Sequence, residues 1–68
     1  MTFDGWLAQQ QQRDDPIGDL ARDAAADPGW PRAGTESDRL LYLADSGAPV
    51  ETQLVLIQAH REYHGLPQ

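Results

Sequence analysis

Apolar residues recur at three- and four-residue intervals along the chain, which is the spacing of helices that bury one face. A first short helix can be capped by Thr2 and carries an apolar side formed by Phe3, Trp6 and Leu7. A second helix begins at Asp15-Pro16, because the aspartate can accept hydrogen bonds from the first turn and proline suits the first helical position. We predict its bounds as 16–26, with a buried face formed by Ile17, Leu20, Ala21 and Ala24.

Two further helices follow the segment Asp-Pro-Gly-Trp-Pro at 27–31, which its prolines and glycine mark as an ordered loop. Thr35 and Asp38 have the spacing of a capping box at the start of the third helix, and Gly47 supplies its stop. The fourth helix is predicted over 49–64, with a stripe formed by Val50, Leu54, Ile57 and Arg61, which Val55 and Leu56 widen. No segment alternates with the period of a strand, so the pattern predicts four short helices.

The chain has 68 residues, so we expect one domain over 1–68 and an all-α fold, a compact bundle of four short helices. A chain of this length buries only about 60% of the surface that its unfolded form exposes, so most large apolar residues must serve the core. We expect Trp30 in that core, although an exposed Trp30 would instead be an interface anchor. The predicted core is Phe3, Trp6, Leu7, Ile17, Leu20, Ala21, Trp30, Leu40, Leu43, Val50, Leu54, Ile57 and Tyr63.

Several motifs resemble those of the YozE family of small bacterial proteins: TFDGWL, PIGDLARD, DPGWP, Tyr-Leu at 42–43 and Ala-x-x-x-Tyr at 59–63. The resemblance covers nearly the whole chain and implies a sterile-alpha-motif-like (SAM-like) helical fold. The chain departs from the family pattern where Asp4 stands for a tyrosine, Trp30 for a phenylalanine and His60 for a tryptophan. SAM-like folds serve protein–protein contacts, polymers or nucleic-acid binding, so the resemblance implies no single activity.

The chain carries five arginines, no lysine and eleven acidic residues, which gives a formal net charge of −6. Nucleic-acid binding usually depends on clustered cations, so this balance argues against nucleic acid and against anionic membranes. It permits a protein partner, including a basic one. The sequence has no signal-peptide pattern, no cysteine and no apolar run near the length of a membrane helix. We therefore expect a soluble cytoplasmic protein that is monomeric or weakly self-associating.

Asp15, Asp19, Asp23 and Asp27 recur every four residues and form a stripe along the second helix. A divalent-cation site needs several oxygens that converge, whereas a straight helix splays its side chains, and no EF-hand spacing is present. We therefore expect no metal, with Asp15 as the helix cap and the other aspartates as a solvated face. Partner contact is the other interpretation, and Asp19, Arg22 and Asp23 are the candidate interaction surface.

His60 and His64 have the i, i+4 spacing of two zinc ligands, but the zinc-protease signature needs glutamate where Arg61 stands. We expect a polar last turn there, or for His60 a partly buried packing residue, and no cofactor. Ser37 and Ser46 are the only serines, and no base is spaced to activate either hydroxyl. We therefore expect no catalytic residues and no enzyme activity.

The function that these interpretations favour is a non-enzymatic protein–protein interaction module of unassigned process, which binds another macromolecule through a helical face. One alternative is a nucleic-acid-associated regulator, which requires four arginines to converge on one face: Arg13, Arg32, Arg39 and Arg61. Another alternative is an acidic nucleic-acid mimic that blocks a DNA-binding protein.

Overall fold

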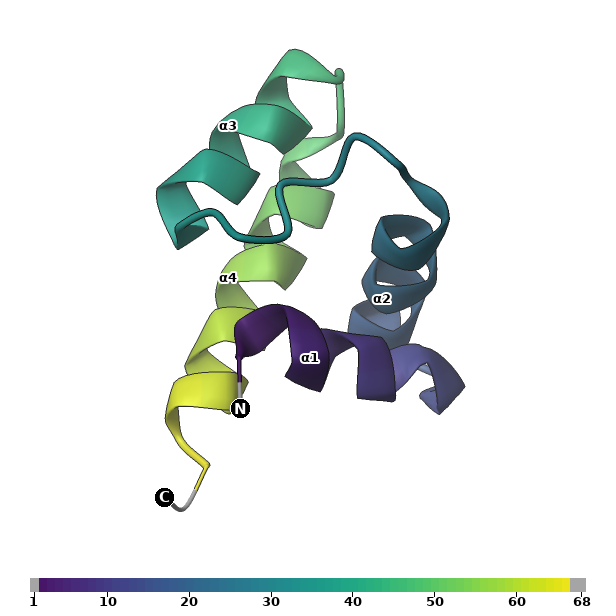
Figure 1. The fold of residues 1–68 in the computed structure, drawn as a ribbon. Coiled ribbons are helices and arrows are strands. Elements are labelled where there is room, and N and C mark those ends of the chain that lie inside the picture. Colours follow the sequence, from purple (N-terminus) through teal and green to yellow (C-terminus); the bar gives the residue numbers. More distant parts are fainter. Residues whose placement is uncertain (1, 67–68) are drawn as a thin grey trace.

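The computed structural model describes residues 2–66, which form four α-helices and one short 3-10 helix, with no strand among them. The elements in chain order are α1 (Phe3–Ala8), η1 (Gln9–Gln12), α2 (Pro16–Ala26), α3 (Glu36–Asp45) and α4 (Val50–His64), as Figure 1 shows. None of the described helices is long and apolar enough to cross a bilayer.

Side-chain capping contacts confirm the predicted starts of α1, α2 and α3, whereas α4 begins after Pro49 without one. The side chains of Thr2 and Asp15 accept hydrogen bonds from the backbone N–H groups of the third helical residues, at 3.0 and 2.9 Å. Thr35 and Asp38 form the reciprocal capping box, with bonds of 3.1 and 2.8 Å. Gly47 follows α3 with a φ of 79°, a left-handed conformation that favours glycine.

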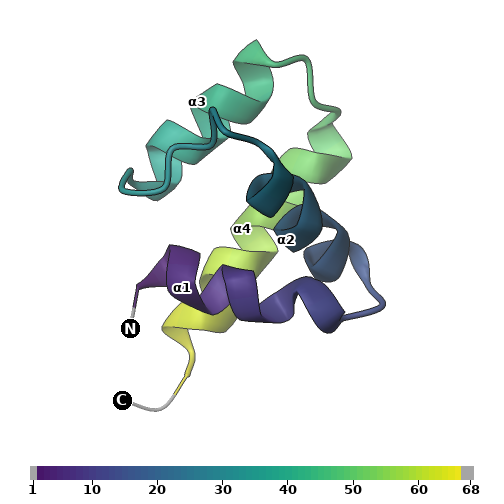
Figure 2. The same cartoon turned by 45° about the vertical axis from the view of Figure 1, so that its right-hand side comes forward.

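Helix α4 lies at the centre of the arrangement, because α1, α2 and α3 all contact it. In Figures 1 and 2, α3 lies against the N-terminal half of α4, and α1 crosses its C-terminal half. The loop between α2 and α3 passes across the molecule and brings Trp30 into the core, where it is 5% exposed. Trp30 is therefore a core residue, as the sequence predicted.

The buried core draws on every α-helix and on the loop before α3. Most of the predicted core is confirmed, with Leu40 and Tyr63 partly buried at its edge. The buried apolar residues are Phe3, Trp6, Leu7, Ile17, Leu20, Ala21, Ala24, Trp30, Leu43, Leu56 and Ala59.

The predicted central stripe of α4 is wrong: Ile57 is only half-buried, and the buried Leu56 had been expected only to widen that stripe. Val50 and Leu54 are 65% and 52% exposed, whereas Leu56, Ala59 and His60 are buried. Apolar residues occupy more than one side of this helix, so periodicity alone does not choose between the sides. Three helices pack on α4, and Ala59 is completely buried among them.

Candidate functional site

A groove lies between α2 and the N-terminal half of α4, and it consists of two adjoining hollows of about 280 and 220 Å³. The two hollows share Leu20, Asp23 and Thr52 in their linings. Apolar side chains from three helices form the floor, and carboxylates stand along the rim. We call it the acidic groove and define it by its floor and rim residues: Leu20, Leu43 and Val55, with Asp19, Asp23, Asp27 and Glu51.

The rim of the acidic groove carries negative charge on both walls. Asp19 and Asp23 stand on α2, Glu51 stands on α4, and no arginine or histidine lines either hollow. Asp19 forms an ion pair with Arg22. Within residues 2–66, the carboxylates of Asp23 and Glu51 make no hydrogen bond or ion pair. Two of the four rim charges are therefore available to a binding partner.

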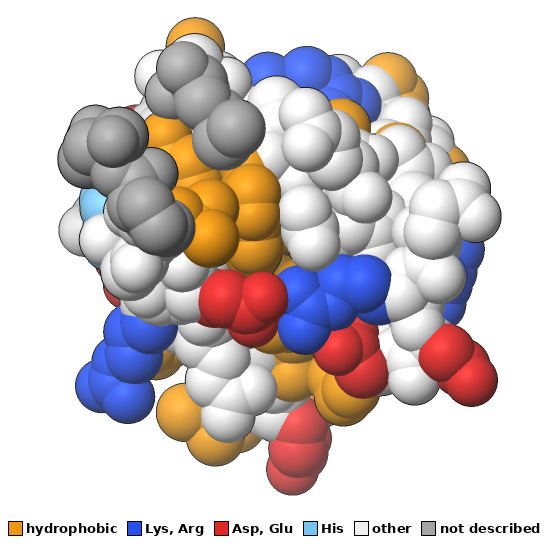
Figure 3. All heavy atoms as spheres, turned by 90° about the horizontal axis from the view of Figure 1, so that it is seen from below, with side chains coloured by type: hydrophobic (Ala, Val, Ile, Leu, Met, Phe, Trp, Pro, Cys, Tyr) orange, Lys and Arg blue, Asp and Glu red, His pale blue; other side chains and the backbone are white. Residues whose placement is uncertain are grey.

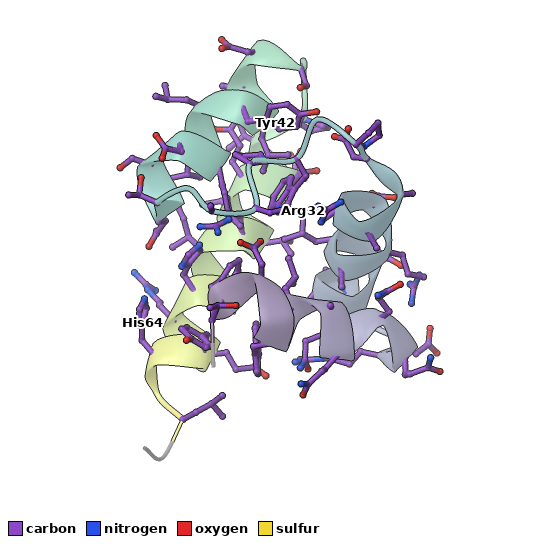
Figure 4. The ribbon with its side chains drawn as sticks, viewed as in Figure 1. Arg32, Tyr42 and His64 are labelled. Carbon is purple, nitrogen blue, oxygen red and sulfur yellow. The ribbon has the colours of Figure 1, made fainter. Side chains whose placement is uncertain are left out.

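Asp27, at the far end of the rim, is held in place by the fold rather than solvated as the sequence predicted. Its carboxylate accepts a hydrogen bond from the Tyr42 hydroxyl and another, of 2.9 Å, from the backbone N–H of Gly29. These bonds lower the pKa of Asp27, and the carboxylate raises the pKa of Tyr42. Figure 4 shows Arg32 pointing to the end of α2, where it donates to the Ala24 and Asp27 carbonyl oxygens at 3.0 and 3.2 Å.

A second cluster of polar groups lies between α1, α3 and α4, and we call it the closed cluster: Phe3, Asp4, Trp30, Arg39 and His60. Arg39 is only 3% exposed and forms an ion pair with Asp4. Asp4 also accepts a hydrogen bond of 3.1 Å from the Trp30 indole N–H. The Arg39 guanidinium carbon lies 4.9 Å from the centre of the Phe3 ring, within cation–π range. The buried charge of Arg39 is therefore balanced on two sides.

His60 completes the closed cluster as a buried, neutral ring, where the sequence suggested a polar turn or partial burial. Its ring stacks on Phe3 with 3.7 Å between ring centres. Burial lowers the pKa of His60, so the imidazole is neutral at pH 7. Both ring nitrogens are buried without a hydrogen bond, and Nδ1 lies 3.8 Å from a Glu36 carboxylate oxygen. A hollow of about 480 Å³ adjoins this cluster, with the exposed His64 at its edge (Figure 4).

Metal ligands do not gather around these histidines. Within residues 2–66 there is no group of three histidine, cysteine, aspartate or glutamate side chains that could hold an ion. The ring centres of His60 and His64 lie 5.9 Å apart. The aspartates along α2 have separate roles: one caps the helix, and three line the acidic groove, one of which also accepts a hydrogen bond from Tyr42.

The arginines are dispersed among separate contacts rather than gathered on one face. Arg13 bonds Asp15 at 2.7 Å and Glu62 at 2.6 Å, which joins the start of α2 to the end of α4. Bonds from Arg13 and from the Gly18 N–H lower the pKa of Asp15. Figure 3, which shows the face below α1, has acidic and basic side chains side by side around an apolar patch. No cluster of free guanidinium groups exists within the described part of the chain.

The structure divides the candidate interaction surface between two places. Asp19 and Asp23 line the acidic groove. Arg22 binds Asp19 from outside the groove and donates to the carbonyl oxygens of Gln11 and Arg13 at 2.7 and 3.0 Å, so it fastens α2 to η1. Sequence reasoning did not single out Glu51, which stands on the opposite wall.

The buried Arg39 was also missed, since arginine is rarely buried unless it is paired. One signal in the sequence pointed to such a residue. Asp4 lies among the apolar residues of the first helix, and a carboxylate at the edge of a core requires a cationic or hydrogen-bonding partner.

The model of the family described as YozE SAM-like fold matches residues 2–65, which is nearly the whole chain. The chain belongs to the YozE SAM-like family. Searches of curated proteins and of solved structures each returned no match. The family assignment confirms the SAM-like, all-α fold that the motifs implied, and it assigns no activity.

Asp4, Trp30 and His60, the three positions singled out in the motif comparison, meet in the closed cluster of this YozE SAM-like chain. Asp4 accepts the hydrogen bond of Trp30, and His60 stacks on Phe3, which lies beside Asp4 in α1. Arg39 contacts both Asp4 and Phe3. The polar groups of Asp4, Trp30 and Arg39 and the His60 ring are therefore joined through one network of contacts.

Proposed function

We propose that this chain is a non-enzymatic protein-interaction module and that the acidic groove is its binding site. One observation carries the proposal: a hollow with Val55 partly exposed in its lining lies between two helices, while Asp23 and Glu51 stand unpaired on its walls. A concave site with a mainly apolar lining and a few polar groups at its edge is typical of a binding site. Grooves between helices are a common site for amphipathic segments of partner proteins.

Two features of the serines and the buried polar groups support a role without catalysis. Ser46 donates its hydroxyl to the Tyr42 carbonyl at 2.8 Å, and no base activates it. In the closed cluster, the charge of Arg39 is balanced by Asp4, and His60 is stacked face to face on Phe3. These groups are engaged in contacts that hold three helices together, and none of them is placed beside a side chain that it could activate as a nucleophile.

The acidic nucleic-acid mimic remains a second candidate because of one observation on α2. Asp19 and Asp23 are one turn apart on α2, about 6 Å along the axis, a spacing that can imitate two neighbouring phosphates. A mimic would act through its carboxylates and would not need an apolar floor. Val55→Ser therefore separates the two functions, because it weakens a partner that occupies the groove and leaves a mimic's partner bound.

A photocrosslinking experiment tests the interaction module directly. A photoreactive phenylalanine analogue replaces Thr52, which lines both hollows, or Asp19, which lines one. The same analogue at the exposed positions Ser37 and Gln12 is the control. We expect irradiation of living cells to give a protease-sensitive, nuclease-resistant adduct from the groove positions only. An absence of groove adducts, or equal adducts from the controls, would contradict the proposal.

A further inference from the structure

We propose that the acidic groove receives a basic amphipathic helix of a partner protein. This inference rests on the proposed function and adds the chemistry of the partner. Lysine or arginine side chains of that helix pair with Asp23 and Glu51, and its apolar side chains lie against Leu20 and Val55.

The positions of the unpaired charges set the pattern that the partner must carry. Asp23 is on the α2 wall and Glu51 is on the α4 wall, with the apolar floor between them. A segment that fills the groove must therefore present cations on both flanks of an apolar strip. Asp19 and Asp27 already have partners in Arg22 and Tyr42, so they contribute negative potential rather than free bonding positions.

The shape of the groove favours a helix over an extended segment. The described residues contain no strand, so no sheet edge is available for a peptide to extend. Helix α2 has eleven residues and is about 16 Å long, which matches about three turns of a second helix. The two hollows offer space for two apolar anchors on one face of that helix.

The same charges disfavour two other occupants. Nucleic-acid phosphates are repelled by a rim of carboxylates that no lining cation offsets. A second copy carries a net charge of −6 and engages most of its arginines internally. Within residues 2–66, Arg61 is the one arginine without a hydrogen bond or ion pair, and a single cation cannot serve both walls.

Synthetic peptides test the inference with the chain as it is. The probe is a helical peptide of about 16 residues, roughly four turns, with leucines along one face and lysines on both flanks. One control peptide has glutamates in place of the lysines, and another has the probe's composition in scrambled order. We expect fluorescence anisotropy at low salt to show the probe binding at least about tenfold tighter than either control, a difference of about 1.4 kcal/mol.

Matched charge variants of the chain locate the binding. D23K/E51K should weaken the probe by about tenfold or more and should improve binding of the glutamate peptide. D14K/D45K changes the net charge equally at two exposed positions outside the linings of the groove, and it should weaken the probe less than about threefold. Amide NMR shifts on adding the probe should centre on Asp23, Thr52 and Val55.

Each contrary result has one meaning. Equal affinity for the scrambled peptide, or equal weakening by both charge variants, overturns the inference, because binding is then a property of net charge. Self-association that D23K/E51K abolishes also overturns it and assigns the groove to a second copy. Groove crosslinks to a protein without binding of the probe overturn the basic helix alone, whereas an absence of groove crosslinks overturns the proposed function itself.

Discussion

The closed cluster and the acidic groove both contain carboxylates beside apolar side chains. The carboxylate of the closed cluster is paired with a cation, whereas two carboxylates of the groove are unpaired. In the closed cluster, Asp4 meets Arg39 and the Trp30 indole, and the arginine is almost completely buried. In the groove, Asp23 and Glu51 line the same hollow from two helices and have no hydrogen-bond or ion-pair partner within residues 2–66. Paired, buried charges hold the helices together, whereas unpaired, exposed charges can form ion pairs with a binding partner.

The difference also concerns distance along the chain. Asp4 and Arg39 are 35 residues apart, so their ion pair forms only when α1 and α3 have docked on α4. Helix α2, which carries Asp23, is stabilised by the Asp15 cap and by its buried apolar residues, and no contact of the Asp23 carboxylate contributes. Removal of a charge should therefore destabilise the protein in the closed cluster and have little effect on stability in the groove.

The largest effect is expected from Arg39→Met. The substitution keeps an unbranched side chain but leaves Asp4 without its cation at the edge of the core, which should cost about 4 kcal/mol of unfolding free energy. Urea denaturation followed by circular dichroism measures this loss. The exposed Arg61→Met is the matched control and should change stability by less than about 0.5 kcal/mol. Adding Asp4→Asn should restore part of the loss, and a loss below about 1 kcal/mol for Arg39→Met alone would refute the closed cluster as a stabilising unit.

A smaller effect is expected from acid acting on His60. Its pKa is lowered in the folded state from about 6.5, so the unfolded state binds more protons below that pH and stability falls as the pH is lowered from 7 to 5. The slope cannot exceed about 1.4 kcal/mol per pH unit for one proton. Asp15 and Asp27 have pKa values below 3.8, so the stability that they contribute is lost only at more acidic pH.

Two variants assign this acid response. His60→Phe should flatten the dependence between pH 7 and 5 and raise stability at neutral pH, because it removes two buried nitrogens that have no hydrogen bond. His64→Gln, at an exposed position, should keep the slope. Persistence of the full slope in His60→Phe would show that another group senses the acid.

The smallest effect on stability is expected from D23K/E51K, the variant that should change binding most. Replacing Asp23 relieves like-charge repulsion with Asp19, and replacing Glu51 removes a favourable charge from the first turn of α4. The two contributions oppose each other. The free energy of unfolding, measured by thermal unfolding, should therefore stay within about 0.5 kcal/mol of that of the original chain. A loss above about 2 kcal/mol would mean that the groove is part of the structural core.

Local signals predicted the helices well because each is set by residues close in sequence. The cap at Asp15, the proline after it and Pro28 beyond its end placed α2 at 16–26, and the structure has the same bounds. The Thr35–Asp38 capping box likewise placed α3. These contacts need no knowledge of the tertiary fold.

The face of α4 could not be predicted in the same way. Val50 and Leu54 lie on one apolar side of the helix and Leu56 on another, and only the docking of three helices selects the second. The burial of Arg39 depends on Asp4, which lies far away in sequence. The groove itself was not predicted. The sequence places Asp19 and Asp23 on one helix, but Glu51 and Val55 join them only through the packing of α2 on α4.

Trp30 contributes to both the closed cluster and the acidic groove. Its indole N–H binds Asp4 in the closed cluster, while the residue also lines one hollow of the acidic groove beside Leu43. The indole also meets the Tyr42 ring edge-on, with 6.0 Å between ring centres. The emission of this native fluorophore should therefore respond when a partner fills the groove, so that a binding event can be followed optically without attaching any dye.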